Sequence, residues 1–244
     1  MSKVCLIIPC YNEASRLNTA AFENFLLTER NYAICFVDDG SDDKTVSLLQ
    51  VLQTKFPGQI FLIRMDINAG KAEAIRKGVS KMYSNGRFDY LGYFDADLST
   101  PLSVAINFVR LLQRNDQLQI IFGSRRLVKE TSIKKNYLRH LVGRCFSFFI
   151  NYYFTISLYD TQCGAKVFRS KIVPIVFERK FISRWLFDIE IILRLRNICG
   201  NDNTVKEIPV KEWVNKRGSK IRFIDLLRLP TEMRAIKKSM KNLE

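Results

Sequence analysis

The first half of the chain alternates short apolar runs with longer segments of helical character, joined by polar turns. The expected strands span residues 3–9, a run that starts at 33 and ends in two aspartates, 59–64, 89–94 and 119–123. The expected helices run from 12 or 15 to about 30, from the SDDKT turn onward, and over 70–84 and 101–115. Strands that are apolar on both faces and alternate with helices predict an α/β fold with a mostly parallel, Rossmann-like sheet between helical layers.

Polar side chains stand at the ends of four consecutive expected strands. They are Tyr11 and Glu13, Asp38 and Asp39, Asn68 to Lys71, and Asp95 and Asp97. Ligands of parallel sheets bind beyond the carboxyl ends of the strands, so we expect one site lined with carboxylates, an amide and a lysine. The chain has neither a G-x-G-x-x-G after its first strand nor a G-x-x-x-x-G-K-[ST], so a nucleotide would be held in another way.

The stretch YLGYFDADLSTP sets Asp95 and Asp97 two residues apart where a hydrophobic run ends. Strand alternation puts both carboxylates on the same side. Mg²⁺ typically takes one or two protein carboxylates together with substrate phosphate oxygens, so the pair predicts a metal-bridged diphosphate. The alternative is a solvated turn in which Ser99 or Thr100 caps a helix that begins at Pro101.

The composition suits one domain with a reduced interior. The chain has 244 residues, 47% of them hydrophobic, which is enough for a core without disulfides. Its six cysteines show no C-x-x-C spacing, and there is a single histidine, His140, so the sequence offers no set of zinc ligands. We therefore expect reduced, mostly buried thiols and a cytosolic protein. The regular alternation ends after 124, which divides a single domain of residues 1–244 into halves 1–124 and 125–244.

The net charge of +15 favours a polyanionic partner, whether nucleic acid, anionic lipid headgroups or phosphorylated substrates. No apolar stretch reaches the roughly 18 to 20 residues of a membrane-spanning helix; the nearest is CFSFFINYYFTISL at 145–158. Basic residues precede it: Arg125, Arg126, Lys129, Lys134, Lys135, Arg139 and Arg144. Two interpretations stay open, a helix lying in a membrane interface or a buried core helix after a solvated basic loop.

The last third of the chain is less regular. We expect a helix over 185–197, a strand over 205–214, a turn at NKRGSK and a basic amphipathic tail over 223–241, whereas the segment DTQCGAKVFRS at 160–170 is left unassigned.

Six motifs taken in order resemble the inverting glycosyltransferases of family 2, which have the GT-A fold. The motifs are IIPCYNE, VDDGSDDKT, NAGKAEAIRKG, YFDADLSTP, DTQCGAKVFR and WLFDIEI. NAGK together with DTQCGAKVF is most similar to the polyprenyl-phosphate sugar transferases, such as the dolichyl-phosphate glucosyl- and mannosyltransferases. The resemblance implies transfer of a hexose from UDP-glucose or GDP-mannose to a polyprenyl phosphate, with Mg²⁺ or Mn²⁺, at the cytosolic face of a membrane.

The resemblance also implies a role for individual residues. Residues 1–124 would bind the donor and 125–244 would face the acceptor and the membrane. The donor-binding set would be Pro9, Tyr11, Glu13, Asp38, Asp39, Asn68, Lys71, Asp95, Arg125 and Lys220. Asp97, followed by Asp95, would hold the metal. Asp188 lies where many members place a catalytic carboxylate, with Glu190 as its neighbour in the same motif; being two apart on a helix they cannot share a face, and Asp188 is favoured.

The acceptor and the mode of membrane attachment stay open. A phosphate monoester has a second pKa of about 6 and needs little activation, whereas a glycan or protein hydroxyl would need a general base. Relatives often carry transmembrane helices that this chain does not show, so the basic surface and the aromatic helix, or a partner membrane protein, would hold it at an anionic membrane. The rival from another class is a non-catalytic anion-binding module, but the carboxylate cluster would repel nucleic acid, which we therefore do not expect as a partner.

Overall fold

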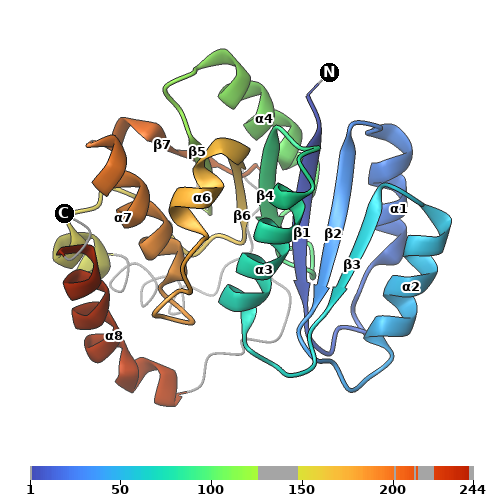
Figure 1. Cartoon of the computed structure of the whole chain (residues 1–244), viewed down its shortest axis with the longest axis horizontal. Coiled ribbons are helices and arrows are strands. Elements are labelled where there is room, and N and C mark those ends of the chain that lie inside the picture. The colour runs from blue at the N-terminus through green and yellow to red at the C-terminus, as the bar shows by residue number, and fades with distance from the viewer. Residues whose placement is uncertain (1, 126–147, 201, 212, 214–222, 242–244) are drawn as a thin grey trace.

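The computed structural model describes residues 2–125, 148–200, 202–211, 213 and 223–241, which contain one seven-stranded sheet (Figure 1). Its strands are β1 (Val4–Cys10), β2 (Tyr32–Asp38), β3 (Ile60–Arg64), β4 (Tyr90–Phe94), β5 (Ile120–Ser124), β6 (Ala165–Arg169) and β7 (Val205–Pro209). Their order is β3-β2-β1-β4-β6-β5-β7. Strand β6 is antiparallel to β4 and β5, whereas the other paired strands are parallel. The predicted α/β class with a mostly parallel sheet is confirmed.

Helices cover both faces of the sheet (Figure 1). They are α1 (Thr19–Thr28), α2 (Thr45–Lys55), α3 (Lys71–Ser84), α4 (Val104–Arg114), α6 (Val173–Val176), α7 (Phe187–Cys199) and α8 (Phe223–Lys241), with 3₁₀ turns η1 (Ser170–Ile172) and η2 (Asp202–Thr204) and a helical segment at 148–154. Side chains of α1, α2 and α4 pack into one core, and those of α3, α6, α7 and α8 pack into the other.

Strand β1 shows why its apolar run is continuous. Cys5 and Ile7 point into the core under α3 and α7, while Leu6 and Ile8 point into the core under α1 and α4. All four are fully buried. Burying an isoleucine or leucine side chain stabilises the fold by about 1.5 to 3 kcal/mol, so both faces of this central strand contribute to stability.

The first helix begins later than its sequence pattern predicts. Helix α1 starts at Thr19, and the side chain of Asn18 caps it by accepting the Ala21 N–H at 3.1 Å. The expected start at Asn12 or Ser15 is wrong, because Asn12 has a left-handed backbone with a φ of 53° and its N–H donates to a serine in another loop. The intervening residues form a loop at the edge of the sheet.

The helix after the D-x-D pair also begins later. Helix α4 starts at Val104, so Pro101 is not its first residue and neither Ser99 nor Thr100 caps it. The N–H of Ser99 donates instead to Asp97 Oδ1 at 2.9 Å. The turn chemistry expected of this stretch is present, but Asp97 rather than a hydroxyl supplies the acceptor.

Strands β6 and β7 depart from the sequence expectations. The predicted strand over 205–214 ends at Pro209. The unassigned segment 160–170 contains β6, which inserts between β4 and β5 and pairs Phe94 with Ala165. Strand β6 thereby brings the second half of the chain to the end of the strand that carries the D-x-D pair. The helices predicted over 185–197 and 223–241 are present as α7 and α8.

Several features singled out in the sequence lie outside the described residues. These are Lys220 with the NKRGSK turn, and Arg126, Lys129, Lys134, Lys135, Arg139, His140, Arg144 and Cys145 of the basic stretch and the start of the aromatic segment.

Candidate active site

The carboxyl ends of β1, β2 and β4 meet at one edge of the sheet. Cys10 at the end of β1 pairs with Asp38 at the end of β2, and Ile7 pairs with Tyr93 in β4. The loops that follow carry the polar groups predicted to converge. The structure therefore brings Tyr11 and Glu13, Asp38 and Asp39, and Asp95 and Asp97 to the same edge.

Asp95 and Lys71 form the centre of this edge. Lys71, the first residue of α3, places its Nζ 2.5 Å from Asp95 Oδ1. Desolvation alone would lower the pKa of Lys71, but the charges of Asp95, Asp188 and Asp97 outweigh it and raise this pKa. A lysine near a helix N-terminus opposes the helix dipole, and the carboxylates around Lys71 compensate for this unfavourable position.

Gly164 from the DTQCGAK segment supports Asp95 from the other side. Its carbonyl accepts the Asp95 N–H at 3.0 Å, and a Cβ atom on Gly164 would lie 1.9 Å from Asp95 Oδ2. The site thus joins the two halves of the chain.

Arg16 is a basic residue of the site that sequence inspection missed. Its guanidinium forms an ion pair with Glu13, which raises the pKa of Arg16, and the charges of Asp97 and Asp95 raise it further. Glu13 is buried, and its N–H donates to Thr45 Oγ1 at 2.8 Å. Glu13 therefore holds Arg16 beside the D-x-D pair and fixes its own loop to α2.

Asp38 and Asp39 are both buried but differ in their contacts. Asp39 accepts the N–H groups of Ala69 and Gly70 at 2.8 Å each, so it holds the NAGK loop; burial raises its pKa. Asp38 Oδ2 accepts the Ser41 N–H at 3.2 Å, whereas Asp38 Oδ1 is buried without a hydrogen-bond partner among the described residues. A buried unpaired carboxylate oxygen is costly unless a ligand donor reaches it.

Arg184 covers the NAGK loop from the second half of the chain and was not predicted either. Its Nη2 donates weakly to Asn68 Oδ1 at 3.4 Å, and its Nε would lie 2.6 Å from a Cβ atom on Gly70. Gly70 has a φ of +95°, a backbone conformation that favours glycine, and a side chain there would also displace the Arg184 guanidinium. Arg194 anchors the loop before Arg184 by donating to the carbonyls of Val176, Arg179 and Lys180 at 2.7 to 2.8 Å.

Arg125 is placed by an ion pair with Asp160 of the DTQCGAK segment. Its Nε and Nη2 donate to the two carboxylate oxygens at 2.6 and 2.8 Å, and its N–H donates at 2.9 Å. Burial would raise the pKa of Asp160, but the Arg125 bonds and charge outweigh it and lower the pKa. Glu207 on β7 accepts the N–H groups of Tyr159 and Asp160 at 2.7 and 2.6 Å, which holds this carboxylate in place.

Asp188 and Glu190, both buried in the first turn of α7, point to different surroundings. Asp188 Oδ1 accepts a hydrogen bond from the Tyr93 hydroxyl and lies 3.0 Å from Lys166 Nζ. Tyr93 lies on β4 two residues before Asp95, so this hydrogen bond joins Asp188 to the strand that carries the D-x-D pair.

Glu190 faces the loop before α7 instead. It accepts the N–H groups of Ile182 and Ser183 at 3.0 and 2.8 Å and pairs with Arg194 at 3.2 Å. Burial raises its pKa. Asp188 therefore contacts the strands β4 and β6, whereas Glu190 contacts the loop before α7 and Arg194.

Asp95 and Asp97 are the donor set available to a divalent metal. Within the described ranges, no group of three His, Cys, Asp or Glu side chains could hold a metal by itself. Two hard carboxylate ligands at a half-exposed edge fit Mg²⁺ or Mn²⁺, provided that the remaining ligands come from a diphosphate and water.

The aromatic segment is divided between core and surface. Ile150 and Phe154 are buried, whereas Phe148, Phe149 and Tyr152 are 74%, 54% and 80% exposed. One side of the described part of this segment therefore packs into the core and the other presents aromatic rings outward, and its place in a membrane interface stays a prediction. Across the described residues, no helix is both long and apolar enough to cross a membrane.

Comparison with known proteins identifies the class of enzyme that this site belongs to. The family model described as "Glycosyl transferase family 2" matches residues 5–175, so the chain belongs to this family and is a glycosyltransferase. Within the family, it is similar to dolichyl-phosphate beta-glucosyltransferases, which confirms the sequence resemblance and favours an enzyme over a non-catalytic binding module.

Three such relatives give the extent of the similarity. The Trichomonas vaginalis ALG5D protein is 29% identical over 242 residues, covering 94% of this chain and 71% of its own. The Dictyostelium discoideum protein is 29% identical over 230 residues, covering 88% and 68%. The Homo sapiens protein is 28% identical over 239 residues, covering 90% and 69%.

Solved structures confirm the GT-A fold. Glucosyl-3-phosphoglycerate synthase from Mycobacterium tuberculosis with phosphoglyceric acid superposes with a TM-score of 0.67 at 13% identity, covering 98% of this chain and 79% of the other. The same enzyme with Mn²⁺, UDP and glucosyl-3-phosphoglycerate gives 0.65 at 14% identity, covering 98% and 80%. Mannosyl-3-phosphoglycerate synthase from Rubrobacter xylanophilus gives 0.65 at 16% identity, covering 99% and 74%.

Proposed function

We propose that this protein transfers glucose from UDP-glucose to a polyprenyl phosphate with inversion at the anomeric carbon. The observation that carries the proposal is that the end of β4 gathers three polar groups: Asp95, its ion-pair partner Lys71, and Asp188, which accepts a hydrogen bond from the Tyr93 hydroxyl. The names of the relatives favour glucose over mannose and a dolichyl-type lipid over other acceptors. A glycan or protein hydroxyl is the alternative acceptor.

The donor side needs groups that bind a nucleotide and accept negative charge. Residues 1–124 supply the donor half. Pro9, Tyr11 and Glu13 would border the nucleobase and ribose, and the unpaired Oδ1 of Asp38 suits an N–H of the base. Asp39 would act by holding the NAGK loop rather than by direct contact, since both of its oxygens accept backbone N–H groups.

The leaving diphosphate would be stabilised by fixed positive charge. The acceptor phosphate oxygen attacks the anomeric carbon, the bond from that carbon to the diphosphate breaks, and its electron pair leaves on UDP. Lys71, which pairs with Asp95, would supply part of this charge, and Arg125 and Arg184 from the second half of the chain would supply the rest. Asp97 and Asp95 would hold Mg²⁺ or Mn²⁺, which supplies Lewis-acid stabilisation of the diphosphate when it is bound. Asp188 would orient the acceptor, because a phosphate monoester is already largely ionised at neutral pH.

Residues 125–244 would face the lipid and the membrane. Phe148, Phe149 and Tyr152 expose aromatic rings on the helical segment 148–154, and the Lys237 Nζ of α8 lies 4.8 Å from the Tyr153 ring centroid. Aromatic rings beside lysine suit an interface of anionic lipid headgroups, where each basic residue contributes about 1 kcal/mol. This surface, with or without a partner membrane protein, would hold the enzyme peripherally at the cytosolic face.

The test is product formation from a panel of UDP- and GDP-sugars with polyprenyl phosphate in detergent, with Mg²⁺ or Mn²⁺, wild type beside Asp97→Ala. We expect a glucosyl lipid only when wild-type protein, UDP-glucose, polyprenyl phosphate and the metal are all present. Metal-dependent hydrolysis of the nucleotide sugar without a lipid product would contradict the proposal that the acceptor is a polyprenyl phosphate. A mannosyl lipid from GDP-mannose would contradict the proposal that the donor is UDP-glucose.

A further inference from the structure

Lys166 is a fully buried charged residue in the middle of the sheet. It lies on β6, a strand that pairs with β4 and β5, and its exposed fraction is 0%. A lysine is almost never fully buried unless it is paired. Its position therefore needs an explanation that packing alone does not give.

The contacts of Lys166 fix its ammonium group in one place. Its Nζ donates to the carbonyl of Cys163 at 2.5 Å and lies 3.0 Å from Asp188 Oδ1. The ring centroids of Tyr93 and Phe122 lie 5.1 and 4.9 Å from the same nitrogen. A carbonyl, a carboxylate and two aromatic faces thus surround the cation, which is a favourable environment for a charge removed from water.

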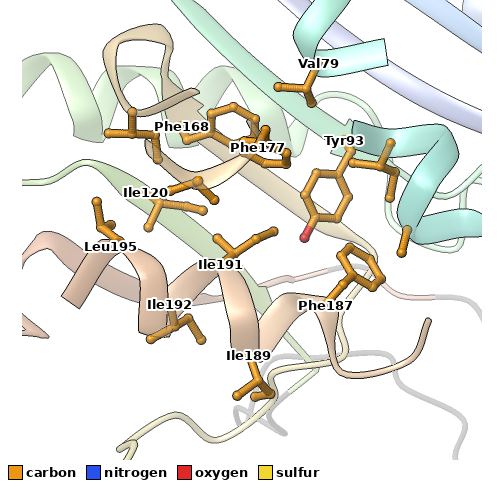
Figure 2. Close-up of a cluster of buried hydrophobic side chains, with 14 of the residues drawn as sticks. Val79, Tyr93, Ile120, Phe168, Phe177, Phe187, Ile189, Ile191, Ile192 and Leu195 are labelled. Carbon is orange, nitrogen blue, oxygen red and sulfur yellow. The ribbon is translucent and has the colours of Figure 1, made fainter. Parts of the chain in front are cut away.

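The Lys166 ammonium and the Tyr93 hydroxyl both contact the same oxygen of Asp188. Oδ1 accepts a hydrogen bond from the Tyr93 hydroxyl and also contacts Lys166, whereas Oδ2 accepts no hydrogen bond from the described part of the chain. Figure 2 shows the Tyr93 hydroxyl directed at the first turns of α7, between Phe187 and Ile191. One carboxylate oxygen is thus anchored from two strands, β4 and β6.

We propose that Lys166 is the positioning residue for Asp188, with Tyr93 as its partner, and that Oδ2 of Asp188 is the oxygen that contacts the acceptor. The inference rests on the proposed function. Lys166 and the Tyr93 hydroxyl fix the position of Asp188 Oδ1, and the chain that carries Lys166 also carries Gly164, two residues earlier, whose carbonyl accepts the Asp95 N–H at 3.0 Å. The orientation of Asp188 and the position of Asp95 are thus set by the same short strand.

The test compares Lys166→Met, Asp188→Asn and the double variant for glucosyl-lipid synthesis, with KM for UDP-glucose measured in each. We expect kcat of Lys166→Met to fall about 10- to 100-fold with little change in KM, as for other supporting groups of an active site. If Lys166 acts through Asp188, the double variant has the kcat of Asp188→Asn, because the positioned group is already lost.

Two further variants keep the result interpretable. Tyr93→Phe removes one donor to Oδ1 with almost no change in volume, and we expect a smaller fall in kcat that also disappears in the Asp188→Asn background. Arg169→Met is the matched control, since it removes a cation from the same strand, where Arg169 pairs with the exposed Asp116 at 3.0 Å; it should lower the melting temperature without changing kcat.

The outcomes separate this inference from the function on which it rests. Wild-type kcat in both Lys166→Met and Tyr93→Phe would overturn the positioning role while glucosyl-lipid synthesis stands. So would a loss in Lys166→Met that is equally large in the Asp188→Asn background. A wild-type protein that makes no glucosyl lipid would overturn the proposed function and this inference together.

Discussion

Gly164 lies directly against the carboxylate of Asp95. A Cβ atom on Gly164 would be 1.9 Å from Asp95 Oδ2 and 2.3 Å from its Cγ. The backbone cannot easily retreat, because the Gly164 carbonyl accepts the Asp95 N–H at 3.0 Å. A residue of the second half of the chain therefore determines where a site carboxylate of the first half can lie.

The substitution Gly164→Ala should displace Asp95 and its partner Lys71. Because a misplacement of about 1 Å can cost about 100-fold in rate, we expect kcat/KM for UDP-glucose to fall by about that factor while the protein remains folded. Gly86→Ala is the control, since open space surrounds Gly86 and only its φ of +67° opposes a side chain. Near-wild-type activity of Gly164→Ala would show that the Asp95 position does not matter.

The two carboxylates of α7 should separate into one that acts in turnover and one that acts in stability. Glu190→Gln weakens the acceptor of two backbone N–H groups and of Arg194, so we expect the free energy of unfolding to fall by about 3 kcal/mol with kcat kept within a few-fold. Asp188→Asn should lower kcat per folded molecule. Urea unfolding and kinetics on the folded fraction measure both, and a large kcat loss confined to Glu190→Gln would reverse the assignment.

The acceptor class can be tested by comparing Asp97→Ala with Asp188→Asn. Asp97→Ala removes a proposed metal ligand and should abolish turnover. Asp188→Asn should leave residual activity, because a phosphate acceptor is ionised without a base. Both variants are assayed for product, for nucleotide binding and for folding. Equal and complete loss in both, with folding intact, would indicate a hydroxyl acceptor.

The sheet and its donor edge could be predicted from sequence because continuous apolar runs and their polar ends are local signals. Asp38, Lys71 and Asp95 were found in this way, and the structure places them at one edge. Arg16, Lys166 and Arg184 were not found, since nothing in their immediate sequence distinguishes them from surface cations.

Their positions follow from tertiary contacts instead. Lys166 depends on β6 inserting antiparallel between β4 and β5, a pairing that a five-residue strand of mixed polarity does not reveal. Helix boundaries failed for a related reason. The Asn12 side chain accepts the Asp42 N–H of another loop, and the Asp97 side chain accepts the Ser99 N–H just before the expected helix start at 101. Such side-chain bonds stabilise turns in competition with helix formation.

The Asp160 ion pair should make stability depend on pH at the acidic end. The pKa of Asp160 is lowered in the folded state, so its ionised form stabilises the fold; that contribution is complete above the unfolded pKa of about 3.9 and is lost as the pH falls through the folded value. We expect Asp160→Asn to cost about 2 kcal/mol at pH 7 and progressively less below about pH 4. Urea unfolding from pH 3 to 8 measures the difference, with Asp116→Asn as an exposed control. A difference that grows toward low pH would contradict the assignment.

Arg184 should contribute to donor binding through its position over the NAGK loop. Its guanidinium lies against Gly70 and reaches Asn68, next to Lys71, so a diphosphate there would meet two cations from opposite halves of the chain. Because a hydrogen bond to a charged group contributes about 1.5 to 3 kcal/mol, we expect Arg184→Ala to raise KM for UDP-glucose at least about tenfold. Lys180→Ala is the matched control, because Lys180 is an exposed cation of the same loop. It contacts Arg194 through its backbone carbonyl, which the substitution keeps. Equal effects of the two substitutions would mean that the loop acts only through its net charge, whereas an effect confined to Arg184→Ala would place this guanidinium on the donor.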